Sequence, residues 1–125
     1  MKQAYPAIIH EEDGSCWVEF PDLEGCFSAG DTIAEAAYNA SEALGLYLCA
    51  KLENGSELPK ATIAADIQAE DGIVTLVATD PDKYRKNTRA VKKTLSIPEW
   101  LNEEAEKRHL NFSSILQQAL INAIE

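Results

Sequence analysis

The distribution of charge along the chain is the feature that most constrains its organisation. Six basic residues stand between positions 83 and 93 with no aspartate or glutamate among them: Lys83, Arg85, Lys86, Arg89, Lys92 and Lys93. Residues 1–82 hold 3 basic and 16 acidic side chains, a net charge of −13, whereas residues 83–125 hold 8 and 5, a net charge of +3. This asymmetry predicts an acidic body that meets a positively charged partner and a basic tail that meets phosphates.

Length and composition predict a folded protein made of one small domain and a smaller appendage. The chain has 125 residues, of which 46% are hydrophobic and 26% charged, which is ordinary for soluble domains. No stretch is apolar enough to span a membrane, so we expect a cytoplasmic protein without a membrane partner. Cys16, Cys26 and Cys49 lack paired spacing, so we expect neither disulfides nor a metal site, and no cofactor.

The body has the pattern of a sheet that is covered by one helix. Thr32-Ile-Ala-Glu35 fits a capping box at the start of a helix, and Asn54-Gly55 supplies its end. Turn residues and alternating apolar positions predict strands on both sides of this helix. The expected order is β-β-β-α-β, with strands at Tyr5–Ile9, Cys16–Phe20, Cys26–Ala29 and Ile73–Ala78.

The tail has a separate pattern of strand, helix, turn and helix. Residues 91–97 alternate between apolar and polar, Pro98 suits the start of a helix, and Asn111 suits the cap of a second helix. We therefore expect a domain at 1–80, a linker at 81–89 and a second domain at 90–125.

The tail is too small to stand alone, because a lone strand and two short helices bury little apolar area. Antiparallel pairing of this strand in two chains would turn Leu95 and Ile97 toward the helices. The opposite face would carry Lys92, Thr94 and Ser96 from both chains, on a ribbon that fits the DNA major groove. The pattern predicts a DNA-binding homodimer, and it leaves open whether two bodies associate further into a tetramer.

The tail resembles the ribbon-helix-helix domains of bacterial repressors. The similarity rests on Lys-Lys-Thr-Leu-Ser-Ile-Pro-Glu-Trp-Leu, which begins at Lys92, and Asn-Phe-Ser-Ser-Ile-Leu-Gln-Gln-Ala-Leu, which begins at Asn111. It implies that the outward strand residues contact base edges and that the start of the second helix grips a phosphate. The base-edge residues would be Lys92, Thr94 and Ser96, and the phosphate-binding residues Arg89, Lys93, Asn111, Ser113 and Ser114. The sequence departs from the family in Ser114, where an acidic residue is common, and in Lys93, which falls at an inward position.

The body resembles HicB-type antitoxins over the segment Phe20-Pro-Asp-Leu-Glu-Gly-Cys-Phe-Ser-Ala-Gly-Asp-Thr and the helix that follows it. The resemblance implies an α+β fold with a partial ribonuclease-H-like N-terminal domain, followed by a ribbon-helix-helix dimerisation domain. It also implies a HicA-type partner, a small basic toxin that cleaves messenger RNA. The complex would repress its own operon.

Candidate toxin contacts lie in and after the second predicted strand. Glu19, Asp22 and Glu24 would offer negative charge to an RNA-binding toxin, and Trp17 and Phe20 would be apolar anchors. The sequence equally allows Trp17 and Phe20 to be core residues and the carboxylates to be solvated.

Two other functions remain open at this point. Glu19, Asp22, Glu24 and Asp31 could serve a two-metal nuclease, but most of them fall in turns or at a helix start, so we do not expect an enzyme. A stand-alone ribbon-helix-helix regulator whose N-terminal domain senses a small ligand is the second alternative.

Overall fold

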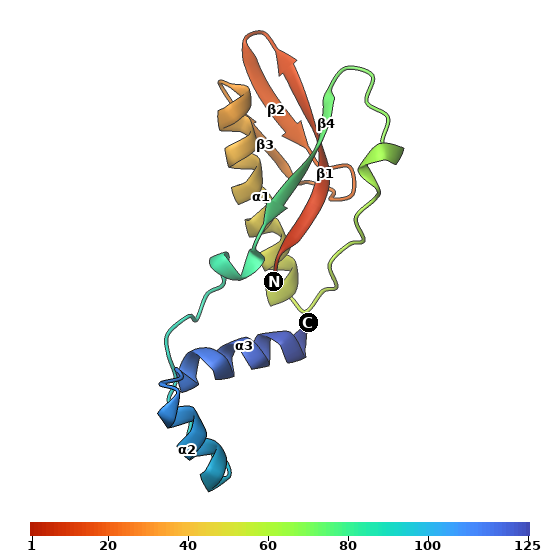
Figure 1. The fold of residues 1–125 in the computed structure, drawn as a ribbon. Helices are drawn as coiled ribbons and strands as arrows, with labels where there is room; N and C mark the ends of the chain where they lie inside the picture. Colours follow the sequence, from red (N-terminus) through yellow and green to blue (C-terminus); the bar gives the residue numbers. More distant parts are fainter. The chain divides into compact units, whose positions relative to one another are not determined.

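A four-stranded antiparallel sheet forms the body of the protein (Figure 1). The computed structural model describes residues 1–125, and the chain divides into two units, Met1–Lys86 and Asn87–Glu125. The order of strands across the sheet is β3-β2-β1-β4, and every neighbouring pair is antiparallel. The strands span Gln3–Glu12 (β1), Ser15–Glu19 (β2), Phe27–Gly30 (β3) and Ile73–Thr79 (β4), which confirms the predicted order.

The turn between β1 and β2 fixes the register of the hairpin. Asp13 and Gly14 both have positive φ, 51° and 81°, as a two-residue turn of type I′ requires. Glu12 therefore pairs with Ser15, and His10 pairs with Trp17. Directly opposed residues share a face of the sheet, so His10 and Trp17 point to the same side.

Helix α1 (Ile33–Glu53) covers the other side of the sheet (Figure 1). The hydroxyl of Thr32 accepts the N–H of Glu35 at 3.1 Å, and Gly55 ends the helix with φ of 75°, so the predicted start and stop are both confirmed. The helix buries every third or fourth residue against the apolar face of the sheet. Those residues are Ala36, Ala40, Leu44 and Leu48, and the sheet contributes Tyr5, Ala7, Ile9, Val18 and Val77.

The connection between α1 and β4, residues 54–72, lies on the opposite side of the sheet from α1 (Figure 1). It includes a short 3₁₀ helix, η1 (Ala64–Asp66). The Tyr5 hydroxyl donates to the Pro59 carbonyl near one end, and His10 Nδ1 lies 2.9 Å from the Asp71 carbonyl oxygen at the other. Ile8 points to this side and is nevertheless buried. No helix in the chain is long and apolar enough to cross a membrane.

Part of the segment expected to be a linker belongs to the first unit. Residues Pro81–Tyr84 form a 3₁₀ helix, η2, in which Pro81 is fully buried. Gly45 makes room for it, because a Cβ at this position would lie 2.2 Å from the ring of Tyr84. Sequence polarity concealed this contact, since only one small and one aromatic residue make it. The irregular segment begins after Lys86, not after position 80.

The second unit contains two helices, α2 (Glu99–Lys107) and α3 (Phe112–Ile124). The Asn111 side chain accepts the N–H of Ser114 at 3.0 Å, so the predicted cap is confirmed. Residues 87–98 form no strand in the single chain, contrary to the pattern at 91–97. A strand needs a neighbour to accept its backbone hydrogen bonds, and the single chain offers none to this segment.

The turn between α2 and α3 is held in a left-handed conformation. His109 has φ of 53°, the Leu110 N–H reaches the Ala105 carbonyl at 3.1 Å, and the His109 N–H reaches that of Glu106 at 3.0 Å. This is the bonding pattern of a Schellman motif, in which glycine normally occupies the position of His109.

The second unit has almost no core of its own. Ala105 is the one buried residue between positions 87 and 125. A domain of this size cannot be stable with its apolar side chains in water. Twelve large apolar side chains are exposed in this unit: Val91, Leu95, Ile97, Trp100, Leu101, Leu110, Phe112, Ile115, Leu116, Leu120, Ile121 and Ile124.

Candidate partner-binding surfaces

The sheet side opposite α1 carries a cluster of His10, Trp17 and Glu19. The rings of His10 and Trp17 stack with centroids 4.1 Å apart and planes 16° from parallel. His10 Nε2 lies 3.6 Å from a carboxylate oxygen of Glu19 and is buried without a hydrogen-bond partner. Trp17 and Glu19 therefore share a face, as their spacing predicts, and both remain partly exposed. The sequence interpretation did not include His10, although the two-residue turn at Asp13-Gly14 places it opposite Trp17.

The other candidates for toxin contact have different surroundings. Phe20 is 3% exposed and lies in the core, so the expectation that it is a surface anchor is wrong. Its position continues the buried alternation of Cys16 and Val18, which explains the burial. The Asp22 carboxylate is already engaged, because it accepts two hydrogen bonds from Thr62. Glu24 is exposed, and its backbone carbonyl accepts the Tyr47 hydroxyl at 2.9 Å.

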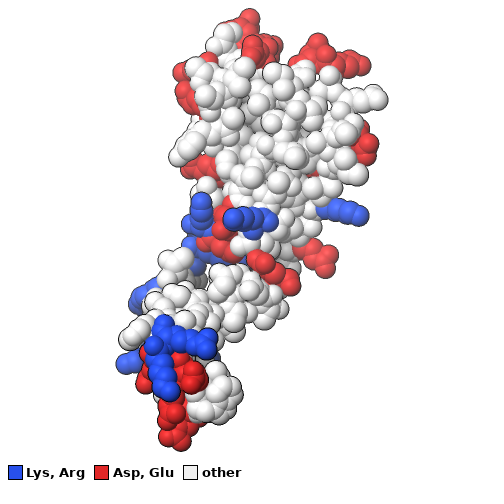
Figure 2. All heavy atoms as spheres, viewed as in Figure 1, with Lys and Arg blue, Asp and Glu red and all other residues white.

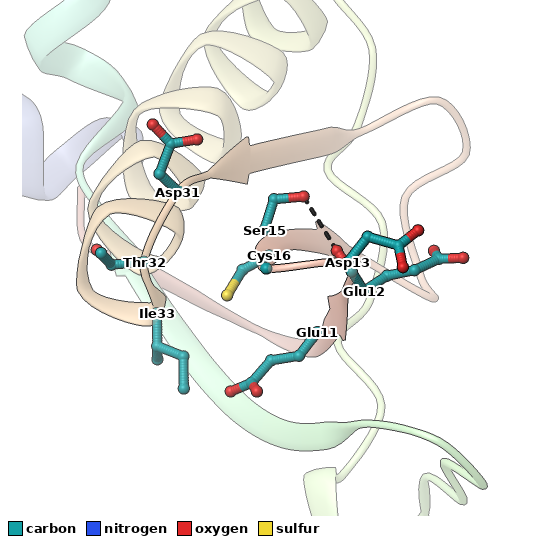
Figure 3. A pocket seen from close by; sticks show the side chains of 9 residues that line it. Glu11, Glu12, Asp13, Ser15, Cys16, Asp31, Thr32 and Ile33 are labelled. Carbon is teal, nitrogen blue, oxygen red and sulfur yellow. Dashed lines mark hydrogen bonds between the residues drawn. The ribbon is translucent and has the colours of Figure 1, made fainter.

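Negative charge gathers at the hairpin end of the sheet (Figure 3). A pocket of about 410 Å³ is open to solvent there, between the β1–β2 turn and the start of α1. Ser15 donates to the Glu12 carbonyl at 3.1 Å at its edge, and no basic side chain lines it. Figure 2 shows red carboxylates around this end of the first unit. Such a surface attracts cationic groups, and its acidic residues are Glu11, Glu12, Asp13 and Asp31.

No site for metal-dependent chemistry forms from these carboxylates. Glu19 lies beside His10 on the sheet, Asp22 binds Thr62, and Asp31 lies at the start of α1. No group of three or more His, Cys, Asp or Glu side chains is arranged to hold a metal ion. The three cysteines are unpaired and buried. Burial raises the pKa of Cys26 to about 11, which suits core thiols and not nucleophiles.

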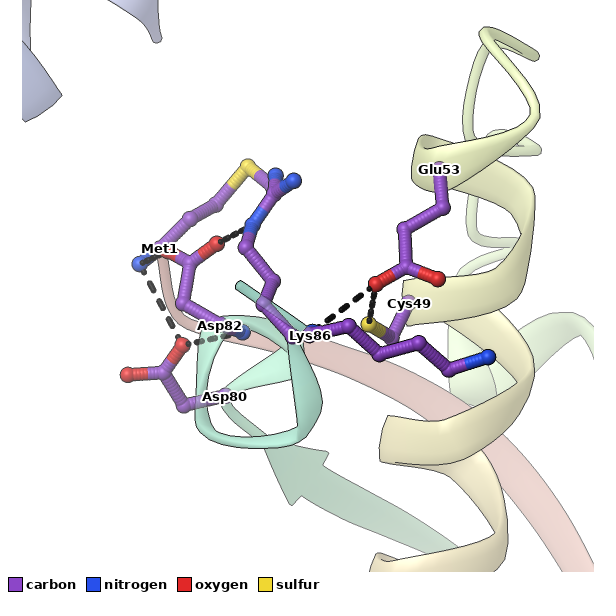
Figure 4. A network of polar contacts seen from close by, with 7 residues as sticks. Met1, Cys49, Glu53, Asp80, Asp82 and Lys86 are labelled. Atoms are coloured by element: carbon purple, nitrogen blue, oxygen red, sulfur yellow. Dashed lines mark hydrogen bonds and ion pairs between the residues drawn. The ribbon is translucent and has the colours of Figure 1, made fainter. Parts of the chain in front are cut away.

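A polar network fixes the end of the first unit (Figure 4). Asp82 accepts from Arg85 Nε at 2.6 Å and from the Met1 ammonium at 2.7 Å. These two bonds, that of the ammonium first, lower the pKa of Asp82. Glu53 accepts the backbone N–H of Lys86 at 3.1 Å, and this bond lowers the pKa of Glu53. The Arg85 side chain is thus part of the acidic unit.

The structural boundary changes the charge of the two parts. Residues 1–86 hold 6 basic and 16 acidic side chains, a net charge of −10. Residues 87–125 hold 5 of each and are neutral, so the tail beyond the boundary is not basic as a whole. Its positive charge is local: Arg89, Lys92 and Lys93 lie in the irregular segment, whereas four glutamates lie in α2. Affinity for DNA would depend on which face these groups present.

The candidate DNA contacts are all exposed. Residues 89–97 lie in an extended segment without neighbours, and it contains Arg89, Lys92, Lys93, Thr94 and Ser96. At the start of α3, Ser113 and Ser114 are exposed too. The Asn111 side chain uses the Ser114 N–H for the cap, so a phosphate at this site would meet the remaining N–H groups of the first turn.

Comparisons with known proteins match this chain along nearly its whole length. A protein encoded in the rep-hol intergenic region of Haemophilus phage HP1 is 32% identical over 130 residues, which is 96% of each chain. A chain of a toxin-antitoxin complex from Streptococcus pneumoniae is 27% identical, with a TM-score of 0.65 over 98% of this chain and 99% of the other. A chain of the HicA3 and HicB3 toxin-antitoxin complex is 30% identical, with a TM-score of 0.54 over 63% of this chain and 100% of the other.

The match to a protein family covers both units. Residues 5–120 fit the family described as HicB_like antitoxin of bacterial toxin-antitoxin system. The mixed α and β architecture, with its antiparallel sheet and three helices, agrees with solved structures of HicB antitoxins. The chain therefore belongs to the HicB-like antitoxin family.

Proposed function

We propose that this protein binds and neutralises a HicA-type toxin that cleaves messenger RNA, and that it represses its own operon by binding operator DNA as a dimer or larger oligomer. The supporting observation is the second unit, in which a basic segment with strand alternation precedes two helices whose apolar side chains are exposed. A single chain cannot satisfy this arrangement. Structures of related chains in toxin-antitoxin complexes support the toxin partner.

Pairing of two chains through residues 91–97 would complete the second unit as a ribbon-helix-helix domain. Each strand would gain the backbone partner that it lacks, and Leu95 and Ile97 would cover the helices of both chains. The apolar area that is now exposed would be removed from water, which is the main driving force for obligate association.

The paired ribbon would present Lys92, Thr94 and Ser96 to base edges in the major groove. Arg89 and Lys93 would neutralise phosphates on either side. The first turn of α3, which contains Ser113 and Ser114 after the Asn111 cap, would hold a further phosphate through its backbone N–H groups.

The acidic unit would bind the toxin by covering its RNA-binding surface. A protein that binds RNA presents positive charge, and the net charge of −10 on residues 1–86 complements it. Trp17, Glu19 and Glu24 stay partly or fully exposed and are the contacts proposed from the sequence that the fold leaves available. We assign the protein a binding role, not a catalytic one, in the cytoplasm.

Selection from a randomised DNA pool tests the repressor function. The full-length protein should enrich a two-fold symmetric motif, and a Lys92→Ala, Thr94→Ala variant should lose it. A Lys60→Ala variant is the matched control, since it removes an exposed lysine from the first unit. Enrichment that survives in the double variant would contradict the assignment of the ribbon.

Co-expression with the cognate toxin tests the antitoxin function separately. The full-length protein should restore growth of cells that produce the toxin. A Trp17→Ala, Glu19→Lys variant should restore less growth at equal protein level, whereas the Lys92→Ala, Thr94→Ala variant should protect fully. Full protection by the first variant would remove this sheet face from the toxin interface.

A further inference from the structure

We propose that the outer edge of β4 is a second interface between copies of this chain, at which two β4 strands pair antiparallel and join two sheets into one. The inference goes beyond the proposed function, since neither toxin neutralisation nor a DNA-binding ribbon requires the bodies to associate. It uses the C-terminal dimer only as a tether.

The edge of β4 is unprotected. β4 is the last strand in the order β3-β2-β1-β4, so one row of its N–H and C=O groups has no partner strand. Its seven residues read Ile-Val-Thr-Leu-Val-Ala-Thr, with none of the lysines or prolines that proteins use to block free edges. Leu76 is 61% and Ile73 is 54% exposed. The opposite edge, β3, has only four residues.

The charge around this edge indicates which partner it fits. Figure 2, in the view of Figure 1, shows uncharged atoms over the middle of the first unit where β4 lies, and carboxylates mainly toward the ends. A basic partner would be drawn to the acidic hairpin end, not to this neutral strip. A second copy of an acidic body would be repelled at that hairpin end, but β4 carries no charge that opposes self-association.

The strand is suited to pairing with itself. When two seven-residue strands overlap fully, Leu76 lies opposite Leu76 of the partner subunit on the two-fold axis. Val74, Leu76 and Ala78 alternate onto one face, the face of β4 that lies away from α1. Those of the two copies would form a continuous apolar row. Cross-strand pairs of this kind stabilise sheets, and the product would be one eight-stranded sheet.

The pairing needs help from the tether. Stable interfaces bury roughly 1,200–2,000 Å², and two short strand edges offer less than that. The C-terminal dimer would hold two bodies at an effective concentration on the order of millimolar, which favours a contact that is weak by itself. Pairing within one dimer would close it, and pairing between dimers would give a tetramer.

Cysteine cross-linking of the full-length protein tests the proposal. Opposed residues in antiparallel strands have Cα atoms roughly 4.5–5.5 Å apart, within reach of a disulfide. A Leu76→Cys variant should therefore form a covalent dimer on mild oxidation. An Ala78→Cys variant should not, because its opposite residue would be Val74 of the partner subunit. A Leu46→Cys variant, exposed on α1, measures random collision, and the native thiols are buried.

The outcomes separate this inference from the proposed function. Cross-linking of the Leu76→Cys variant at least tenfold above the other two supports the β4 interface. Equal yields in the three variants, or a higher yield in either control, overturn it. A Leu95→Lys change in the ribbon should abolish selective DNA binding and lower the Leu76→Cys cross-link. Intact DNA binding without the cross-link removes only the β4 interface, whereas a cross-link without DNA binding removes only the ribbon.

Discussion

The Asp22 carboxylate accepts both the backbone N–H of Thr62, at 2.8 Å, and its hydroxyl, at 2.5 Å. Asp22 lies in the turn after β2, and Thr62 lies in the connection on the far side of the sheet. The pair thus anchors residues 54–72 forty positions away from the turn. The sequence interpretation proposed Asp22 as a toxin contact, but the geometry gives it a structural role.

Replacement of Asp22 by alanine should destabilise the first unit by about 1–2 kcal/mol, because two hydrogen bonds to a charged group are lost at a partly exposed site. Thr62→Val removes only the hydroxyl and should cost about half as much. Urea unfolding followed by Trp17 fluorescence, in a Trp100→Phe background, measures both. Equal stability of the Asp22→Ala variant and the parent would exclude this anchoring role.

Glu53 gives the first unit a dependence on pH. Its folded pKa is lowered from 4.5 chiefly by the N–H of Lys86, so its contribution is present above that value and is lost as the pH falls through the lowered one. Glu53→Gln should reduce stability at neutral pH, and the difference should vanish at low pH. Unfolding between about pH 3 and pH 7 tests this, and a constant difference would contradict it.

Replacement of His109 by glycine should stabilise the second unit by about 1 kcal/mol, because a residue with a side chain is strained in the left-handed region. Gly55 already occupies the matching position after α1. Thermal unfolding of the full-length protein at one fixed concentration measures the effect, and Asn102→Gly, inside α2, is the control that should destabilise. A lower melting temperature for His109→Gly would show that the side chain has a contact in the assembled protein.

Arg89 and Thr94 should affect DNA binding differently. Arg89→Ala should weaken binding to all sequences alike and reduce the slope of log affinity against log salt by about one, as expected for one phosphate contact. Thr94→Ala should leave that slope unchanged and reduce discrimination between operator and random DNA by about 1–3 kcal/mol. Fluorescence anisotropy over a salt series separates the two, and the reverse pattern would exchange their roles.

Charge at the hairpin end should control how quickly the toxin is captured. Glu12→Lys should slow association by about threefold to tenfold at low ionic strength, with little change at high salt. Glu103→Lys makes the same change in net charge in the second unit and should have a smaller effect. Stopped-flow mixing with the toxin gives both rate constants. Similar slowing in the two variants would mean that net charge, not the acidic hairpin end, steers the encounter.

Local chemistry explains which parts of the fold were predictable. The caps at Thr32 and Asn111, the stop at Gly55 and the turn at Asp13-Gly14 depend on one or two side chains each, and the structure has them where the sequence places them. The failures concern longer-range packing. Pro81 and Tyr84 join the first unit through contacts with a distant helix, which a polar stretch of sequence does not reveal.

The candidate sites show the same limit. The alternation in β2 predicts that Trp17 and Glu19 share a face, and the structure agrees. It does not show that Phe20 is buried or that Asp22 is bound by Thr62, because both facts depend on segments that return to the sheet much later. The pattern at 91–97 describes a strand that one chain cannot build alone, so its assignment stays a prediction.

The exposed apolar side chains of the second unit make the lifetime of the protein depend on its abundance. For a unit that folds only when paired, stability cannot be separated from concentration. A chain without a partner displays the greasy, loosely held helices that chaperones and proteases recognise. When synthesis slows, each lost molecule leaves another without its mate, and we therefore expect removal to accelerate as the pool declines. The same residues that hold the assembly together would thus time its disappearance.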